Sequence, residues 1–600
     1  MCGIIGYIGK NSNAKNIAIN GLKNLEYRGY DSSGIAVVED DKLNIYKAEG
    51  KISNLEKTLS DKNILSSIAI AHTRWATHGK PSKTNAHPQQ SGCVTLVHNG
   101  IIENYNELKT ELLKKQVVFN TDTDTEVACA YINELYKTNK NKIEILRKAC
   151  NNFRGSYAFA IIFEDQKDTI YAARKDSPLI LGLSDNGNFI ASDVSAILEY
   201  TNKYILLNSG EFAKINCNDT VVFNSEGTII KKDINIANWN CTEYEKNGYK
   251  HFMLKEINDQ PKVVSNIFKR YMLGDMKIDI DFTKYTNIHI VACGSAMHAG
   301  LIGKFLFENY AKIPTMVEVA SEYRYNEQLI SKSTLVIIIS QSGETADTLA
   351  ALRIAKEKNA TVIGIVNTVG STIAREADNT IYTYAGPEIA VATTKGYTTQ
   401  IATLSVLAIE ALKSKNMLST KLKANIFNEF KNIEKVLTNT IKNQNEYKKI
   451  ADCIYKNDDL FFIGRGIDYA ISMEGSLKLK EISYMHSEAY PAGELKHGTI
   501  SLIDNNTPVI VIASNPDLYE KTISNAIEAK SRGAFVIFLT NSPSTYANFA
   551  NISLTVTKQN DFLQPLVIIT ALQLIAYETA KLRKCDIDKP KNLAKSVTVE

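Results

Sequence analysis

An internal repeat in the second half of the chain is the feature that most constrains its fold. Three apolar segments recur about 170–174 residues later: 288–294 matches 460–464, 335–340 matches 509–514, and 361–365 matches 534–538. The segments alternate with turns and helical patterns, the order found in doubly wound α/β domains with a parallel sheet. A constant separation across three buried strands indicates two copies of one such fold.

The first 240 residues or so follow a different pattern. Short apolar segments typical of strands stand at 34–38, 67–71, 94–97, 156–162 and 220–223, with helical stretches near 13–25 and 123–136. We predict an α+β domain of packed antiparallel sheets at 1–240, a linker at 241–248, and α/β domains at 249–417 and 418–584. The stretch 400–450 is expected to be helical, and 585–600 is predicted to be a polar tail.

Composition excludes several classes of function. The 69 Lys and Arg residues nearly balance the 65 Asp and Glu residues, so the chain lacks the positive charge of a nucleic-acid or anionic-membrane binder. No run reaches the ~18 apolar residues of a membrane span, and the N-terminus shows no secretory signal pattern. The nine cysteines are scattered without a C-x-x-C pair, which favours reduced thiols in the cytoplasm over disulfides or a zinc site.

Cys2 stands directly after the initiator methionine. Removal of Met1 would leave a thiol and a free α-amine on the same carbon. Because that amine has a pKa of about 7.7–8.0, part of it is neutral near pH 7 and can act as the base for the thiol. Met-Cys-Gly alone equally suits a small residue placed there by chance. Four histidines between positions 72 and 98 match no metal-ligand spacing.

Four further segments give Cys2 a context: 25–34, 72–79, 85–88 and 98–104. Together they resemble the glutaminase domain of N-terminal-nucleophile (class II) glutamine amidotransferases. The resemblance implies stacked antiparallel sheets between helices, with Cys2 attacking the glutamine amide. It also implies an oxyanion hole made by the Asn99 side chain and the Gly100 N–H.

The same resemblance implies how glutamine is held. Arg74 would bind its α-carboxylate through two parallel hydrogen bonds, and Asp124 would pair with its α-amine. The loop 74–79, with Thr77 and His78, would close over glutamine, and Trp75 would gate an ammonia channel. The family usually has His where this chain has Gln89. Without the resemblance, an isolated Arg is more often a solvated surface charge.

Ser340-Gln-Ser-Gly-Glu-Thr345 follows an apolar strand and opens a helix. Hydroxyls and free N–H groups at a helix N-terminus favour a bound phosphate, although helix capping alone would also use them. The string resembles the phosphosugar-binding loop of sugar isomerase (SIS) domains. The resemblance implies sugar-phosphate contacts from Ser340, Gln341, Ser342, Thr345, Gly294, Ser295, Val391 and Thr393. The chain departs from the family's pattern at Ala296, and at Thr393, where Ser is usual.

The second copy has Ser514-Asn-Pro-Asp in place of the phosphate loop. It offers Lys478 and Glu481 instead, three residues apart on one face of a predicted helix. Such a pair is either a surface ion pair of little energetic weight or, in a cleft, a charged acid–base pair. The segment 492–498, which contains His497, and the tail 592–600, which contains Lys595, complete the motifs of this half.

Across the whole chain the motifs resemble the glutamine–fructose-6-phosphate aminotransferases, which make glucosamine 6-phosphate and glutamate from fructose 6-phosphate and glutamine. The resemblance implies that Lys595 forms a Schiff base with the ketose and that Glu481 moves a proton between C1 and C2. Lys478 would stabilise negative charge, and His497, from the partner subunit of a homodimer, would help to open the sugar ring. No metal and no organic cofactor is implied.

Three other functions share part of this pattern. An asparagine synthetase requires an S-G-G-x-D-S loop, and a purine-pathway amidotransferase requires a phosphoribosyltransferase domain; the sequence shows neither. A non-catalytic SIS sugar-phosphate sensor with a vestigial glutaminase explains the segment 340–345. It leaves Cys2, His497 and Lys595 together unexplained, and it stays open as the alternative.

Overall fold

The computed structural model describes residues 2–237, 245–542 and 548–598. The chain divides into two compact units, one of residues 1–242 with 594–600 and one of residues 243–593. The first contains the predicted α+β domain, and the second contains both α/β repeats. Residues 241–244 of the predicted linker lie outside the described residues. The predicted tail is divided, because 585–593 belong to the second unit and 594–600 to the first.

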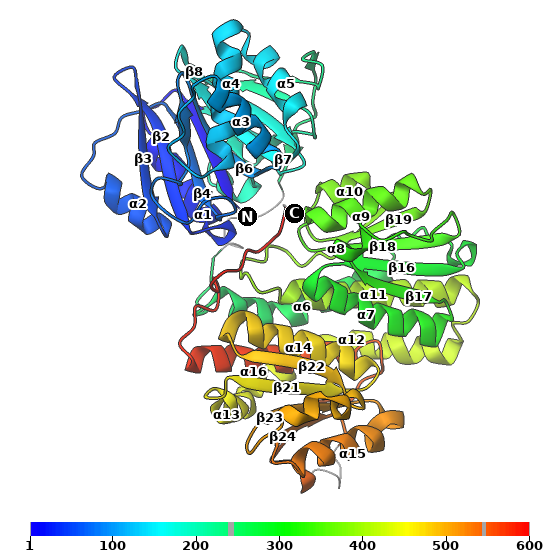
Figure 1. Cartoon of the computed structure of the whole chain (residues 1–600). Helices are drawn as coiled ribbons and strands as arrows, with labels where there is room; N and C mark the ends of the chain where they lie inside the picture. Colours follow the sequence, from blue (N-terminus) through cyan, green and yellow to red (C-terminus); the bar gives the residue numbers. More distant parts are fainter. Residues whose placement is uncertain (1, 238–244, 543–547, 599–600) are drawn as a thin grey trace. The chain divides into compact units, whose positions relative to one another are not determined.

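The first unit is built on two antiparallel sheets (Figure 1). The eight-stranded sheet has the order β15-β11-β9-β10-β1-β4-β2-β3, and the seven-stranded sheet has the order β14-β13-β12-β8-β7-β6-β5. The strands of the first sheet are β1 (Gly3–Gly9), β2 (Ser32–Glu39), β3 (Lys42–Glu49), β4 (Ile68–Arg74), β9 (Ile180–Ser184), β10 (Gly187–Ala191), β11 (Lys203–Leu206) and β15 (Asn235–Ile236). Those of the second are β5 (Gln89–Ser91), β6 (Val94–Ile102), β7 (Gly155–Phe163), β8 (Gln166–Lys175), β12 (Phe212–Ile215), β13 (Thr220–Phe223) and β14 (Ile229–Ile230).

Alternation along β1 explains why the sheets stack. Ile4 and Ile8 share a buried cluster with side chains of the second sheet, whereas Ile5 and Tyr7 join a cluster with helix side chains. Successive side chains of a strand point to opposite faces, so one apolar strand contributes to two cores. Helices α1 (Ala14–Leu25) and α2 (Ile52–Leu59) cover the outer face of the first sheet, and α3 (Tyr105–Lys114), α4 (Asp124–Thr138) and α5 (Lys142–Asn152) cover the second.

The second unit contains two parallel five-stranded sheets (Figure 1). Their orders are β17-β16-β18-β19-β20 and β22-β21-β23-β24-β25. The strands are β16 (Asn287–Ala292), β17 (Thr315–Val319), β18 (Thr334–Ser340), β19 (Thr361–Val366) and β20 (Asn379–Tyr382), then β21 (Asp459–Gly464), β22 (His486–Pro491), β23 (Pro508–Ala513), β24 (Phe535–Thr540) and β25 (Ile552–Thr555).

The two sheets confirm the predicted repeat. Each places its second strand at the edge, its first strand next, and then the remaining strands in chain order. Equivalent strands start 171 residues apart at β17 and β22, and 174 apart at β18 and β23. The antiparallel sheets of the first unit and the parallel sheets of the second therefore give the fold class expected from the sequence.

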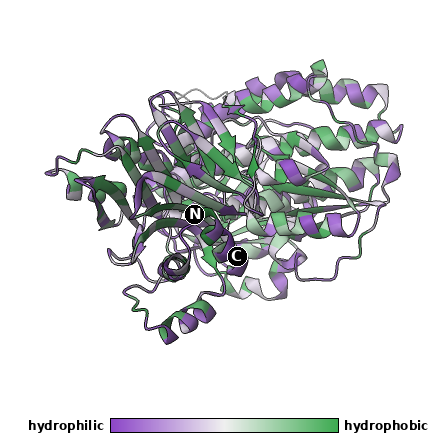
Figure 2. Cartoon of the chain, turned by 90° about the horizontal axis from the view of Figure 1, so that it is seen from above, coloured by the Kyte–Doolittle hydropathy of each residue, from purple (hydrophilic) through white to green (hydrophobic). Residues whose placement is uncertain are grey.

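One hydrophobic core spans both repeats. It contains Phe268, Ile290 and Leu404 together with Phe462 and Leu572. The helices of the unit are α6 (Phe252–Leu273), α7 (Gly294–Leu306), α8 (Ala320–Tyr323), α9 (Ala346–Glu357), α10 (Thr372–Glu376), α11 (Lys395–Ser414), α12 (Thr420–Lys442), α13 (Gln444–Ile454), α14 (Ile467–Ser483), α15 (Tyr519–Lys530) and α16 (Gln564–Leu582). Figure 2 shows hydrophilic and hydrophobic residues side by side along helices, as expected where a helix buries one face.

Helix α16 is the one described helix that is long and apolar enough to cross a membrane. Its apolar window is 89% buried inside the structure, among side chains of both repeats. Burial of this kind is typical of a core helix in a globular unit.

Candidate active sites

Strand pairing brings Cys2 beside the loop that follows β4. Gly3 of β1 pairs with Thr73, so Cys2 lies opposite the end of β4. The Trp75 N–H donates to Cys2 Sγ at 3.2 Å, and the thiol lies 3.4 Å from the Trp75 carbonyl. Burial raises the pKa of the Cys2 thiol, while the Trp75 N–H and the charge of Arg74 oppose this rise. The surroundings therefore include two groups that favour the thiolate.

Asn99 is fixed with its amide nitrogen toward Cys2. Asn99 Nδ2 donates to the Cys2 carbonyl at 3.0 Å, and Asn99 Oδ1 lies 3.1 Å from His72 Nε2. Burial, first, and the nearby Arg74 lower the pKa of His72 to about 3, so a neutral ring donates from Nε2. His72 thus orients the amide that the sequence assigned to the oxyanion hole. The next residue, Gly100, has φ +122°, and a Cβ there would lie 2.0 Å from the Ser156 carbonyl oxygen.

Arg74 and Asp124 supply opposite charges around the same thiol. Arg74 is 2% exposed, and its Nη2 donates to the carbonyls of His78 and, at 3.1 Å, Gly79. Its Nη1 is buried without a hydrogen-bond partner in the described part of the chain. Asp124 Oδ2 accepts from the Ile102 N–H at 2.9 Å at the start of α4. A buried guanidinium with a spare donor and a buried carboxylate match the two charged ends of an amino acid.

The loop between β4 and β5 is ordered by local contacts. The Ala76 N–H donates to Asp31 Oδ2 at 2.8 Å, and the Trp75 and Tyr30 rings meet edge to face at 6.2 Å. The His78 ring packs against Tyr105, whereas Thr77 is exposed. Gln89, where the family usually has His, bonds to the Ala86 carbonyl and to Lys47. Gln89, although it departs from the family's pattern, therefore helps to fix the loop through these hydrogen bonds.

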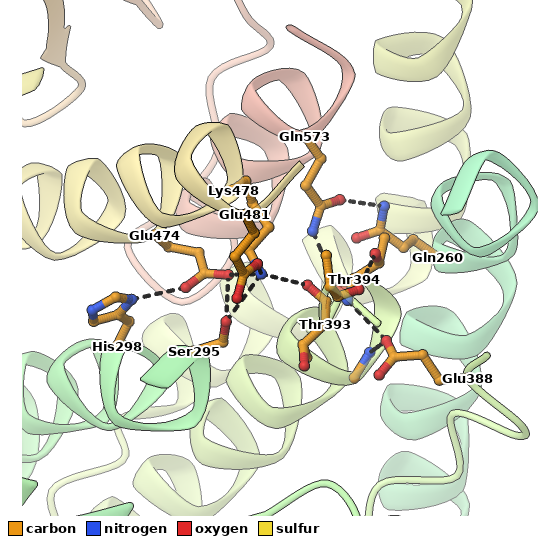
Figure 3. A network of polar contacts seen from close by, with 12 residues as sticks. Gln260, Ser295, His298, Glu388, Thr393, Thr394, Glu474, Lys478, Glu481 and Gln573 are labelled. Carbon is orange, nitrogen blue, oxygen red and sulfur yellow. Dashed lines mark hydrogen bonds and ion pairs between the residues drawn. The ribbon is translucent and has the colours of Figure 1, made fainter. Parts of the chain in front are cut away.

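In the second unit, α14 carries a buried cluster of charges (Figure 3). Lys478 is 0% exposed, and its Nζ contacts Glu481 Oε2, Ser295 Oγ at 3.2 Å and the Thr393 carbonyl at 3.1 Å. Burial lowers the pKa of Lys478, but Glu474 and Glu481 outweigh it and raise that pKa above the ordinary value. Lys478 is therefore a fixed cation at a junction of the two repeats.

Glu474 belongs to this cluster and was not singled out in the sequence. It is fully buried, accepts from Ser295 Oγ at 2.9 Å and from His298 Nδ1 at 2.8 Å, and lies 3.3 Å from Lys478 Nζ. Burial raises the pKa of Glu474, but Lys478 and His298 hold it below the ordinary value. Its four-residue spacing from Lys478 was visible in the sequence, whereas its contacts with Ser295 and His298 depend on tertiary structure.

The segment that carries Val391 and Thr393 is held from several sides (Figure 3). Glu388 Oε1 accepts from the N–H groups of Thr394 and Gly396, both at 2.8 Å. Gln573 Nε2 donates to the Thr394 carbonyl at 3.2 Å, and the Val391 N–H donates to the Asp588 carbonyl at 3.0 Å. The Thr393 carbonyl that accepts from Lys478 therefore belongs to a fixed loop.

The predicted phosphate loop connects β18 to α9. Ser340 Oγ lies 2.9 Å from Thr345 Oγ1 and accepts from the Gly343 N–H at 3.0 Å. Gly343 has φ +66°, and a Cβ there would lie 2.0 Å from Ser371 Oγ, so this turn requires glycine. Gln341 and Ser342 are half-buried in the same turn. β16 lies next to β18 and leads to Gly294 and Ser295, so both segments stand at the carboxyl edge of one sheet.

Two predicted residues belong to other segments of the chain. His497 is exposed at the end of a 3₁₀ turn, η6 (Glu494–His497). Lys595 belongs to the short stretch 594–600 of the first unit. The structure thus brings together Ser295, Thr393, Lys478 and Glu481, and the roles of His497 and Lys595 stay predictions.

Comparisons with known proteins agree with the domain organisation of both units. A glutamine amidotransferase domain model matches residues 72–199, and a SIS domain model matches 281–410 and 453–583. The chain is 46% identical to the glutamine–fructose-6-phosphate aminotransferases (isomerizing) of Clostridium acetobutylicum and Clostridium tetani, over 100% of each chain. The chain belongs to this aminotransferase family. It is also 39% identical to a solved C-terminal domain of glucosamine-fructose-6-phosphate aminotransferase from Francisella tularensis, with a TM-score of 0.55, covering 57% of this chain and 99% of that one.

Membership in this family confirms the resemblance drawn from the motifs. The chain is an enzyme that combines a glutamine amidotransferase domain with two SIS domains. The relatives give no support to a non-catalytic sugar-phosphate sensor. Within residues 2–237, 245–542 and 548–598, no group of three or more His, Cys, Asp or Glu side chains is arranged to hold a metal ion.

Proposed function

We propose that the chain converts fructose 6-phosphate and glutamine to glucosamine 6-phosphate and glutamate, the first step of hexosamine synthesis. The observation that carries the proposal is the pair of sites in one chain. Cys2 lies beside the Asn99 amide and Arg74 in one unit, and Lys478 is buried between Glu474 and Glu481 in the other. The curated relatives named above are aminotransferases over their full length.

In the first unit, the Cys2 thiolate attacks the amide carbon of glutamine, and the α-amine exposed by loss of Met1 takes the thiol proton. The Asn99 amide and the Gly100 N–H stabilise the tetrahedral oxyanion, and ammonia leaves. Water then hydrolyses the γ-glutamyl thioester to glutamate. Arg74 binds the α-carboxylate of glutamine, and Asp124 binds its α-amine. The loop that carries Thr77 and His78 closes over glutamine, and Trp75 gates the channel for ammonia.

In the second unit, Ser340, Gln341, Ser342 and Thr345 bind the phosphate, with Gly294, Ser295, Val391 and Thr393 lining the sugar. The Lys595 amine condenses with the C2 carbonyl of the open-chain ketose to form an imine and release water. Ammonia then displaces the lysine amine and leaves its own nitrogen on C2. Glu481 then moves a proton from C1 to C2, and Lys478 stabilises the negative charge on oxygen during this transfer.

The enzyme works as a cytoplasmic homodimer in this proposal. His497 of one protomer opens the sugar ring bound by its partner, which suits a histidine exposed at a turn. The eight cysteines that the structure describes are all free, as expected in a reducing compartment. The domain boundaries remain 1–240, 249–417 and 418–584, with 241–248 as linker and 585–600 as catalytic tail.

A coupled assay tests the function. Purified chain with glutamine and fructose 6-phosphate should release glutamate and glucosamine 6-phosphate in equal amounts. Glutamate release without the amino sugar would reject the synthase reaction, and binding of fructose 6-phosphate without either product would restore the sensor.

A further inference from the structure

The two repeats can be aligned residue by residue at their ligand-binding edges. Ser340 pairs with Val366 at the end of β18 and β19, as Ala513 pairs with Thr540 at the end of β23 and β24. Helices α9 and α15 then begin at Ala346 and Tyr519, and both are 12 residues long. The phosphate loop 340–345 therefore corresponds to 513–518, one residue earlier than the sequence comparison of 335–340 with 509–514 places it. Its hydroxyl positions 340, 342 and 345 correspond to Ala513, Asn515 and Leu518.

The turn after the first strand of each repeat aligns in the same way. Gly294 and Gly466 have nearly equal left-handed φ angles of +54° and +57°. Two residues later the first repeat has Ala296, with only a methyl group, and the second repeat has Asp468. The second repeat has thus lost three hydroxyls and gained one carboxylate at neighbouring positions.

The Asp468 carboxylate accepts hydrogen bonds from the loop 513–518, which replaces the phosphate loop in the second repeat. Its Oδ2 accepts from the N–H of Ser514 at 2.8 Å and of Asn515 at 3.3 Å, and its Oδ1 accepts from Ser514 Oγ. Asp468 is 1% exposed, and no ion pair among the described residues involves it. The aligned N–H groups in the first repeat are those of Gln341 and Ser342, in the proposed phosphate loop.

We propose that Asp468 is a built-in anion that takes, in the second repeat, the place a sugar phosphate takes in the first. The inference rests on the proposed function, in which the loop 340–345 holds the phosphate. Neighbouring backbone N–H groups in a turn favour an anion, and a fixed carboxylate supplies one permanently. A phosphate monoester would then find the N–H groups of Ser514 and Asn515 already bonded to Asp468, and the negative carboxylate would repel it. Each chain therefore binds one sugar phosphate although it contains two copies of the fold.

The charge of Asp468 is consistent with this role under working conditions. Burial raises the pKa of Asp468 to about 6, while the hydroxyl of Ser514 and the N–H groups of Ser514 and Asn515 oppose that rise. At pH 8 the carboxylate is ionised. In binding experiments at pH 8, the loop 513–518 is therefore occupied by the ionised Asp468 carboxylate, whereas Ala296 stands at the equivalent position of the first repeat.

The sharpest test transfers the carboxylate to the first repeat. We expect Ala296→Asp to weaken binding of glucosamine 6-phosphate by about tenfold or more relative to the isosteric, uncharged Ala296→Asn, measured by isothermal titration calorimetry at pH 8. Hydrolysis of glutamine should be alike in both variants, which reports that the chain is folded. Equal affinities in the two variants would overturn the proposal.

Stoichiometry gives a second test, with Ser342→Ala as the control for the proposed function. The unmodified chain should bind one glucosamine 6-phosphate, and Asp468→Ser should bind a second equivalent of inorganic phosphate. The proposal would also be overturned if the unmodified chain bound two sugar phosphates, or if a folded Asp468→Ser variant bound no additional phosphate. If Ser342→Ala bound glucosamine 6-phosphate with unchanged affinity, the phosphate loop itself would be rejected. If Ser342→Ala bound it more weakly while Ala296→Asp and Ala296→Asn bound it equally well, only the role of Asp468 would be rejected.

Discussion

Replacing Glu474 with Gln tests the buried charge cluster of α14 most directly. The substitution keeps the shape of the side chain but removes one of the two carboxylates that balance Lys478. Two unit charges 3.3 Å apart, the distance from Glu474 Oε1 to Lys478 Nζ, attract by roughly 5 kcal/mol at an effective dielectric of about 20. Desolvation offsets part of this, and removing one partner of a buried pair typically costs about 3–5 kcal/mol.

We therefore expect Glu474→Gln to lower the free energy of unfolding of the second unit by about 3–5 kcal/mol. Urea unfolding followed by circular dichroism measures the change. The matched control is Glu446→Gln, because Glu446 pairs with Lys449 at 2.7 Å while the two side chains are 41% and 68% exposed. Such a surface pair contributes about 1 kcal/mol or less. An unfolding free energy for Glu474→Gln within about 0.5 kcal/mol of the control would refute the reasoning.

Three further outcomes are expected. A verified, uncleaved N-terminal tag should abolish glutamine hydrolysis, because Cys2 needs its own α-amine as base; full hydrolysis by the tagged chain would contradict this. His72→Phe should lower kcat for glutamine hydrolysis at saturating glutamine by about tenfold or more, because Asn99 loses the hydrogen-bond partner of its Oδ1. For comparison, complete removal of an oxyanion-hole donor lowers kcat by about 10²–10³-fold. An unchanged kcat would show that the bond from His72 does not position the Asn99 amide. Borohydride with fructose 6-phosphate should label Lys595, and Lys595→Arg should abolish synthesis but retain glutamine hydrolysis; a label on Lys478 or Lys395 in peptide mapping would reject the assignment.

The sequence was sufficient for those features that depend on short-range pattern. Each predicted strand of the first domain lies within or overlaps an observed one, because apolar alternation reflects a strand between two cores. The repeat was visible because buried parallel strands are continuously apolar. Helix α6 gave no such signal, and it contains Pro261, a residue that normally interrupts a helix.

Features made by distant residues could not be predicted in this way. The pairing of Lys478 with Glu481 follows from helical spacing, but Glu474 receives its bonds from Ser295 and His298, more than 170 residues away. The contact between His72 and Asn99 likewise depends on strands packed in different sheets. A single sequence shows which residues carry charge or an amide, and only tertiary structure shows which of them are buried together.

The hydrophobic core shared by both repeats has a consequence for how this half of the chain can be divided. Phe268 of α6 stacks on Phe430 of α12 at 3.8 Å, and Gln260 of α6 bonds to Gln573 of α16 at 2.8 Å. A cut near residue 418, where the two α/β copies meet in sequence, would expose this core on both pieces. We therefore expect the two copies to fold as one cooperative unit, because neither keeps a complete interior when the other is removed.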